Sequence, residues 1–281
     1  MYRIREKKIL NPTVTLMEIE APYVAASARP GQFIILRVDE NGERIPLTVA
    51  GCDKAKGTVR IIFQIVGATT AALNRKNVGD AVADFAGPLG KPTEVEGLKK
   101  VCVVGGGVGC AIALPIAEEL HRLGCEVHTV IGFRSKDLLI LEKEFAAVSD
   151  RMAVMTDDGS AGRQGVVTLP LGEWLAAGEN YDEIITIGPL IMMKFVVATA
   201  RPYGVPTVVS MNPIMIDGTG MCGGCRLTVG GETKFACVDG PDFDGYLIDF
   251  DEAMSRAAMY RDFEAAKREE DCNLFRAAEN K

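Results

Sequence analysis

The sequence predicts an antiparallel β-barrel, followed by a doubly wound α/β domain and a small cysteine-rich segment. Three observations lead to this fold class. Short apolar strands separated by Gly, Pro and Asn fill residues 1–97. Strands alternate with helices over residues 98–210. Glycine and cysteine then dominate residues 211–250, and a chain of 281 residues has room for two ordinary domains.

The barrel prediction depends on strand-like runs at residues 14–20, 32–38 and 58–66. The first alternates apolar and polar residues, and the other two are nearly continuous in Val, Ile and Phe. No long helical pattern interrupts them, although residues 71–75 could form one or two helical turns. Short strands with turn residues between them are typical of a small barrel.

The α/β prediction depends on a change of period near residue 97. We expect strands at 101–104, 126–131, 153–156 and 183–187, and helices at 111–123, 141–148 and 168–176. This alternation is typical of a parallel sheet covered by helices on both faces. After the cysteine-rich segment, residues 251–281 are expected to form a helix over 251–267 and a polar tail.

Composition narrows the function classes. Asp and Glu outnumber Lys and Arg by 38 to 31, which disfavours a nucleic-acid partner. Two histidines are too few for a His-rich metal site. The N-terminus has no apolar region typical of a signal peptide, and no stretch predicts a membrane span. We therefore expect a soluble cytoplasmic protein with no membrane partner.

A glycine loop follows the first strand of the α/β region. Its residues are Gly105, Gly106, Gly107, Val108 and Gly109. Glycines between a strand and a helix allow close approach of a pyrophosphate, although Cys110 departs from the full dinucleotide motif and a turn without a ligand is the alternative. Glu126 lies where a ribose-binding acid could sit, or it is simply solvated. Arg134, after the second strand, could meet an adenosine phosphate or ribose, or face solvent.

Four residues in the cysteine-rich segment have the spacing of a metal site. Asp217, Cys222, Cys225 and Cys237 follow the pattern Asp-x4-Cys-x2-Cys-x11-Cys. A plant-type 2Fe–2S site has Cys-x4-Cys-x2-Cys and a distant fourth Cys, so an aspartate here takes the first position. The spacing favours a 2Fe–2S cluster. Structural zinc and free thiols are the alternatives, and Asp217 could instead cap a turn.

Together and in this order, these features resemble the FAD- and NAD-binding electron-transfer subunits related to ferredoxin–NADP reductase. The resemblance covers residues 3–250. The family includes electron-transfer subunits of dihydroorotate dehydrogenase B, sulfide dehydrogenase subunits and the small subunit of NADH-dependent ferredoxin:NADP oxidoreductase. It implies an FAD-binding barrel over 1–97, an NAD(P)-binding domain over 98–210 and a 2Fe–2S segment over 211–250.

The resemblance also implies roles for particular residues. Arg44 would contact the FAD pyrophosphate, and Leu47 and Thr48 would lie beside the isoalloxazine; otherwise Arg44 is an exposed hairpin charge. The implied flavin contacts are Arg44, Pro46, Leu47, Thr48, Ile65, Val66, Gly67, Thr69, Thr70 and Gly87. The implied walls of the nicotinamide cleft, besides the glycine loop, are Arg134, Asp157, Asp158 and Gly188.

Asp217 separates the members of this family. Dihydroorotate dehydrogenase subunits carry four cysteines, whereas one aspartate with three cysteines resembles the small subunit of the electron-bifurcating NADH-dependent ferredoxin:NADP oxidoreductase. The resemblance implies hydride transfer between nicotinamide C4 and flavin N5, then single-electron exchange with the cluster. It implies NAD(H), with NADP(H) as the alternative, a larger flavin and iron–sulfur partner subunit, and ferredoxin as an indirect partner.

Three other functions fit part of the pattern. The chain could serve a dihydroorotate or sulfide dehydrogenase, or act as a self-sufficient ferredoxin reductase. It could also be a zinc-containing regulatory module that senses a nucleotide. The cofactor content separates the last from the electron-transfer functions, since only the latter need flavin and iron.

Overall fold

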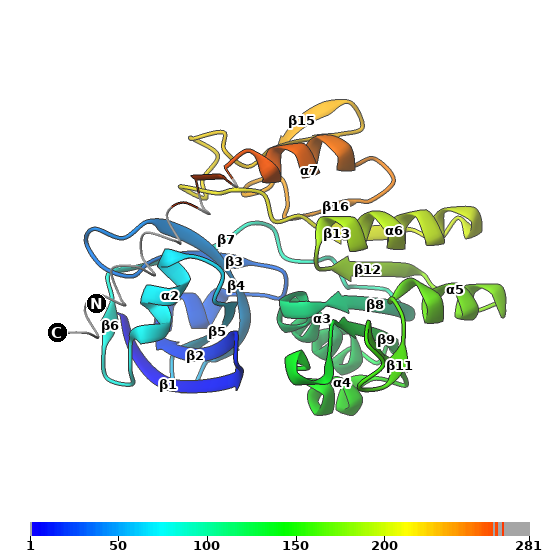
Figure 1. Ribbon diagram of the computed structural model, residues 1–281, viewed down its shortest axis with the longest axis horizontal. Coiled ribbons are helices and arrows are strands. Elements are labelled where there is room, and N and C mark those ends of the chain that lie inside the picture. The colour runs from blue at the N-terminus through cyan, green and yellow to red at the C-terminus, as the bar shows by residue number, and fades with distance from the viewer. Residues whose placement is uncertain (1, 261, 264–265, 267–281) are drawn as a thin grey trace.

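The computed structural model describes residues 2–260, 262–263 and 266 (Figure 1). Its first sheet has seven antiparallel strands in the order β6-β1-β2-β5-β4-β3-β7. These strands are β1 (Tyr2–Asn11), β2 (Val14–Glu20), β3 (Phe33–Arg37), β4 (Arg44–Asp53), β5 (Thr58–Gln64), β6 (Ala81–Val82) and β7 (Asp84–Leu89). Only Ala83 separates the two edge strands, β6 and β7, so the sheet curls into a nearly closed barrel. The predicted barrel is confirmed.

The barrel contains strands that the sequence pattern did not predict. β1 carries five charged residues and buries only Ile4 and Asn11, so its apolar signal is weak. β4, β6 and β7 are short or interrupted by polar residues. Two helices, α1 (Pro22–Ser27) and α2 (Ala68–Arg75), connect strands at its ends.

The two faces of the barrel strands pack on different partners. Met17 and Ile61 are fully buried inside the barrel. Their neighbours Leu16 and Ile62 point the other way and pack on the α/β domain, in one cluster with residues of α3 (Cys110–Arg122). Alternation along a strand sends successive side chains to opposite faces. This shared core fixes the barrel against the second domain.

The second sheet is parallel except at one edge. Its order is β11-β10-β9-β8-β12-β13-β16, and only β16 runs antiparallel to its neighbour. The strands are β8 (Lys100–Gly106), β9 (Glu126–Phe133), β10 (Arg151–Thr156), β11 (Arg163–Gln164), β12 (Glu183–Ile187), β13 (Thr207–Ser210) and β16 (Asp242–Asp244).

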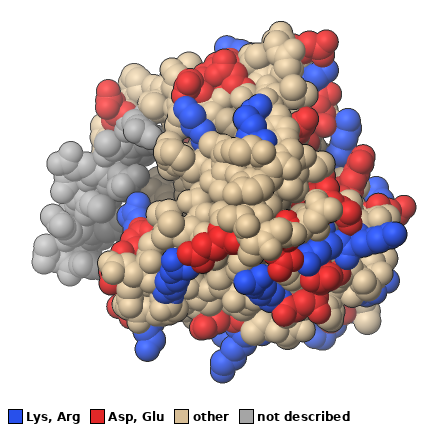
Figure 2. Space-filling view, turned by 90° about the vertical axis from the view of Figure 1, so that its right-hand side faces the viewer, with Lys and Arg blue, Asp and Glu red and all other residues tan. Residues whose placement is uncertain are grey.

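Helices cover both faces of this sheet, which confirms the doubly wound prediction. Val101 and Val103 of β8 pack with α3 and α4 (Glu142–Val148). Cys102 and Val104 point to the other face, toward α5 (Thr168–Ala176) and α6 (Leu190–Ala200). Figure 1 shows α4 and α6 on opposite sides of the sheet. On the face turned to the viewer in Figure 2, basic and acidic side chains are interspersed.

The cysteine-rich segment packs against both domains. It contains a hairpin, β14 (Arg226–Val229) and β15 (Glu232–Phe235), and it is followed by α7 (Phe250–Ala258). Its core residues share a cluster with Phe33 of the barrel and Met193 of α6. The segment also supplies β16 to the α/β sheet, which the sequence did not predict.

The predicted C-terminal helix over 251–267 is interrupted. α7 ends at Ala258, a turn follows at Met259 and Tyr260, and the described residues Asp262, Phe263 and Ala266 are again helical. Residues 261, 264–265 and 267, and the tail with Cys272, lie outside the described residues. Among the described residues, no helix has the length and apolar character needed to cross a membrane.

Candidate functional site

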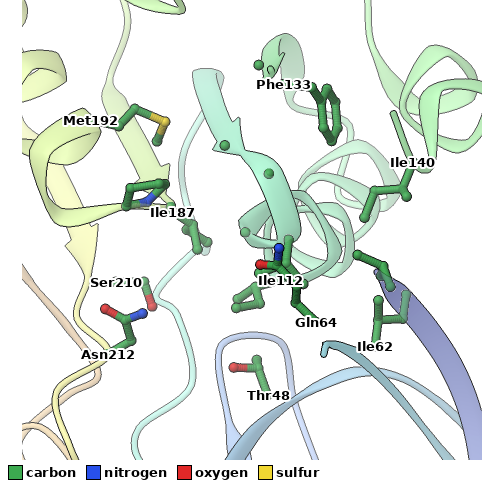
Figure 3. Close-up of a pocket in the computed structure, with 18 of the residues that line it drawn as sticks. Thr48, Ile62, Gln64, Ile112, Phe133, Ile140, Ile187, Met192, Ser210 and Asn212 are labelled. Atoms are coloured by element: carbon green, nitrogen blue, oxygen red, sulfur yellow. The ribbon is translucent and has the colours of Figure 1, made fainter. Parts of the chain in front are cut away.

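A cavity of about 1110 Å³ lies between the barrel and the carboxyl ends of β8, β9 and β12. From β8 the chain continues outward to β9 and β10, and later returns to β12 and β13 on the other side. Open α/β sheets bind ligands at such a switch point. Figure 3 shows side chains of both domains around the cavity, with Thr48 and Gln64 from the barrel and Ile187 and Met192 from the α/β domain.

Many of the residues predicted from sequence line this cavity. They are Pro46, Leu47, Thr48, Val66, Thr70, Gly106, Gly107, Val108, Gly109, Arg134, Asp157 and Gly188. The structure therefore brings the proposed flavin and nicotinamide segments to one space, although they are far apart in the chain.

The glycine loop lines the cavity, and at two of its glycines a side chain would not fit. Gly107 has a positive φ of 55°. A Cβ at Gly109 would lie 2.5 Å from the carbonyl oxygen of Ile187, and one at Gly106 would lie 2.3 Å from Met192 Sδ. The loop leads directly into α3, whose N-terminus favours a phosphate. Cys110, which breaks the dinucleotide motif, is fully buried.

The second flavin segment forms the start of α2. The Thr70 hydroxyl accepts hydrogen bonds from the amides of Val66 and Gly67, at 3.0 and 3.1 Å. The Thr69 hydroxyl donates to Glu43 at 3.1 Å, and Thr69 does not line the cavity. Thr70 thus holds the turn that brings Val66 to the cavity.

Several predicted residues lie outside the cavity lining. They are Arg44, Ile65, Gly67, Thr69, Gly87, Gly105 and Asp158. Arg44 is exposed at the start of β4. A Cβ at Gly87 would lie 2.6 Å from Ile34 Cγ2, so packing of β7 on β3 requires this glycine. Their cofactor contacts stay predictions.

Two adjacent aspartates, Asp157 and Asp158, follow the end of β10 and differ in their hydrogen-bond partners. The Asp158 carboxylate accepts from the amide and hydroxyl of Ser160, at 2.9 and 2.6 Å, which holds its pKa below the usual value. Asp157 and Arg134 are exposed and line the cavity. Within the described residues, neither of these two side chains has a hydrogen-bond partner. Asp158 therefore shapes the turn, while Asp157 and Arg134 are available to a ligand.

The structure rules out Glu126 as a ribose-binding acid. Glu126 begins β9, at the edge of the sheet opposite to the glycine loop. Its carboxylate pairs with Lys100 Nζ at 2.8 Å and lies 3.0 Å from His128 Nε2. A sequence interval of about 20 residues does not tell which end of a strand a residue occupies.

Only part of the proposed cluster site is assembled. Cys225 and Cys237 are buried, with their sulfurs 3.2 Å apart, whereas Cys222 is exposed. The Asp217 carboxylate accepts from the amides of Thr219 and Cys222, at 2.5 and 2.7 Å, so it caps the loop as the alternative interpretation had it. Among the described residues, no three acidic, His or Cys side chains are placed to hold a metal.

The chemistry of this loop nevertheless suits a metal cluster. Burial, the contact with Cys225 and the charge of Asp217 raise the pKa of Cys237 to about 12. Two thiols and a carboxylate are thus crowded together, and bound iron would replace the thiol protons. Cys222 lies on the same loop, three residues from Cys225, and Gly220 and Gly223 supply positive φ values there. The fourth ligand role of Asp217 stays a prediction.

Sequence reasoning missed residues on the far wall of the cavity. Ser210 ends β13, Asn212 and Met215 come after it, and all three line the cavity (Figure 3 labels the first two). Met215 also belongs to the hydrophobic cluster that contains Cys225 and Cys237. Their position after the end of a parallel strand was the one signal that could have found them.

Comparison with known proteins agrees with this geometry. Residues 212–249 match the model of the iron–sulfur cluster binding domain of dihydroorotate dehydrogenase B. The chain is 51% identical, over 88% of its length and 86% of the relative, to a homolog of the dihydroorotate dehydrogenase B (NAD(+)) electron transfer subunit from Thermotoga maritima. It belongs to this family of FAD- and NAD-binding electron-transfer subunits. An electron transfer subunit from Streptococcus pneumoniae is 33% identical over 86% of the chain and 97% of the relative.

Solved structures support the same family. One, from a study of flavin-based electron bifurcation in NADH-dependent reduced ferredoxin-NADP oxidoreductase, is 47% identical. It has a TM-score of 0.90 and covers 96% of this chain and 97% of that one. The family member described here is an NAD(P)H-dependent flavin and iron–sulfur oxidoreductase subunit, and a partner catalytic subunit is implied. The zinc-containing regulatory alternative is wrong.

Proposed function

We propose that the chain is the small subunit of an electron-bifurcating NADH-dependent ferredoxin:NADP oxidoreductase. It would carry FAD and a 2Fe–2S cluster, and it would exchange electrons with NAD(H) and a larger flavin and iron–sulfur subunit. The observation that carries this proposal is the 47% identity to the bifurcating enzyme's structure over nearly the whole chain. Asp217 in place of the first cysteine supports it.

The cavity suits two ring systems that meet face to face. Leu47 and Thr48 offer one wall for a flavin ring, and the glycine loop and Gly188 leave room for a dinucleotide opposite it. When bound, FAD accepts hydride at N5 and passes single electrons onward. The protein's task is to position the rings and exclude water.

Apolar side chains would exclude water from the space between the rings. Phe133, Ile140, Ile187 and Met192 form much of the wall around the reacting space (Figure 3). Among the cavity-lining residues, neither of the two histidines appears, which agrees with a reaction that needs no general base. The pyrophosphate of the nicotinamide dinucleotide would be held by the amides of the glycine loop and the N-terminus of α3.

One packed wall connects the cavity to the cysteine loop. Met211 and Met215 line the cavity, and both belong to the cluster that includes Cys225 and Cys237. Asp217 lies two residues after Met215. Cofactors held on either side would be separated by this one layer of packed side chains.

The second candidate is the electron-transfer subunit of a dihydroorotate dehydrogenase. The match to that family's cluster domain, the 51% identity to the Thermotoga maritima homolog and the relatives at 30–37% identity favour it. The bifurcating enzyme's structure, at 47% identity, matches a larger share of the chain, 96% against 88% for the Thermotoga maritima homolog.

The test is anaerobic purification, alone and with each candidate large subunit. We expect FAD, with about two irons and two sulfides per chain and no zinc, since this is the content of a 2Fe–2S cluster. With its proper partner, we expect NADH- and ferredoxin-dependent NADP reduction. Absence of flavin and iron would overturn the electron-transfer role. Dihydroorotate oxidation in its place would select the second candidate.

A further inference from the structure

Two arginines bind consecutive carbonyl groups of the loop between Cys222 and Cys225. Arg226 Nη1 donates to the oxygen of Gly223 at 3.2 Å. Arg256 Nη2 donates to the oxygen of Gly224 at 3.3 Å. The loop therefore has a cationic side chain on each of its two glycine carbonyls.

These contacts help to hold the loop's peptide groups, together with the backbone amide of Arg226, which also donates to the Gly223 oxygen, at 3.4 Å. In a trans peptide, the N–H lies opposite to the C=O of the preceding residue. Because the Gly223 oxygen faces Arg226, the Gly224 amide points the other way, and it donates to Cys222 Sγ at 3.4 Å. By the same geometry, the Cys225 amide points away from Arg256. Of these two N–H groups, that of Gly224 is directed at a thiol.

Arg256 is held in place independently of the loop. It lies on α7, one turn after Glu252, so both side chains are on one face of the helix. Glu252 Oε2 accepts from the amide of Thr228 in β14 at 3.0 Å. The side chain of Asp249 caps the same helix at the amide of Glu252. Glu252 thus fixes α7 to the hairpin, and Arg256, one helical turn later, contacts the cysteine loop.

This helix lies outside residues 212–249, which match the cluster-binding family model. Arg226 lies inside it, directly after Cys225. Of the two arginines on the loop carbonyls, Arg226 therefore belongs to the cluster-binding domain and Arg256 follows that domain in the chain.

We propose that Arg226 and Arg256 are positioning residues that raise the reduction potential of the cluster. The inference rests on the proposed function, since it needs a cluster at this loop. Hydrogen bonds to cluster sulfurs and nearby positive charge both favour the reduced, more negative state. Arg226 and Arg256 supply the charge and orient the amides that make such bonds.

The test is redox titration of the 2Fe–2S signal, by EPR and visible spectra, in the full-length flavoprotein. We expect Arg256→Gln and Arg226→Gln each to lower the equilibrium constant for cluster reduction about tenfold, which is about 59 mV for one electron. Arg256→Lys keeps the charge but not the forked donor, so we expect a smaller shift with altered EPR g values. Lys234→Gln is the matched control: it removes an exposed charge of the same hairpin that pairs with Glu232 and does not contact the loop.

Three outcomes decide the inference. Unchanged potentials in both Gln variants would overturn it, as would a shift in Lys234→Gln as large as theirs. Loss of iron from both Gln variants, with FAD content and melting temperature unchanged, would also overturn it, because the arginines would then be needed to retain the cluster and not to set its potential. Iron analysis of the parent protein tests the proposed function by itself. A parent without iron would overturn that function, whereas the potentials of the variants test only the role of the arginines.

Discussion

At the scale of single residues, Asp217 has two possible tasks, loop cap and cluster ligand. We expect Asp217→Cys to retain a cluster but to change its potential, because a thiolate is a softer ligand than a carboxylate and changes the cluster's surroundings. EPR and redox titration measure this directly. Asp217→Asn is the control, since its side-chain oxygen can still accept from the Thr219 or Cys222 amide. Spectra and potentials identical to the parent in Asp217→Cys would show that Asp217 only caps the loop.

The choice of dinucleotide is also decided by single residues. The Asp157 carboxylate is unpartnered within the described residues and lines the cavity, where it would repel a 2′-phosphate. We expect Asp157→Ser to raise the affinity for 2′-phospho-ADP-ribose about tenfold, or about 1.4 kcal/mol, relative to ADP-ribose. Isothermal titration calorimetry with the two ligands measures the ratio.

Asp158→Ser is the control for this substitution. Its carboxylate is already bound to Ser160, so we expect a lower melting temperature and an unchanged ligand ratio. A ratio that changes with Asp158 and not with Asp157 would contradict the assignment.

At the scale of elements, the contact of α3 with β12 depends on a missing side chain. A Cβ at Gly109 would meet a backbone oxygen, which cannot move away as a side chain could. We expect Gly109→Ala to cost about 1–3 kcal/mol of unfolding free energy, as overpacking does, and to weaken dinucleotide binding. Chemical denaturation and calorimetry measure the two effects.

Gly172→Ala provides the matched control on another helix. Gly172 lies within α5, and its Cβ would make an ordinary contact of 3.6 Å with Thr199. We expect a gain of roughly 0.5–1 kcal/mol there, because alanine is the better helix residue. Equal destabilisation by Gly109→Ala and Gly172→Ala would mean that the contact between Gly109 and the Ile187 carbonyl is not the cause.

At the scale of the whole molecule, acidic groups gather where the barrel joins the α/β sheet. The Thr93 hydroxyl, in the connection between the domains, donates to Asp242 of β16 at 2.5 Å. Burial, together with the charges of Asp242, Glu94 and Asp244, raises the pKa of Glu183 to about 7. Burial also raises the pKa of Asp242.

The raised carboxyl pKa values predict a pH dependence of stability. The folded chain binds protons that the unfolded chain releases near pH 4.5, so the unfolding free energy falls as pH rises from about 4.5 to 7. We expect Glu183→Gln to flatten this slope in thermal melts, without abolishing it, since Asp242 also titrates. A slope as steep as the parent's would contradict the assignment to Glu183.

The local patterns of this chain predicted much of the architecture. The change from strands to alternating strands and helices identified both domains. The glycine loop identified the carboxyl end of β8, and the cysteine spacing identified the candidate metal-binding loop. Resemblance to a family added the flavin residues, of which Leu47 and Thr48 line the cavity. These signals are readable because they depend on neighbours in the chain.

Tertiary structure decided what depends on distant residues. β1 is a strand because it pairs with β2 and β6; its own sequence is too rich in charged residues to predict one. Glu126 lies at the end of the sheet opposite to the glycine loop, while Asp157 lies at the same end as the loop and lines the cavity. The sequence by itself determined the kinds of element and the cofactor class. Only the folded chain set Ser210 at the cavity and Arg256 on the cysteine loop, because these contacts form between segments far apart in sequence.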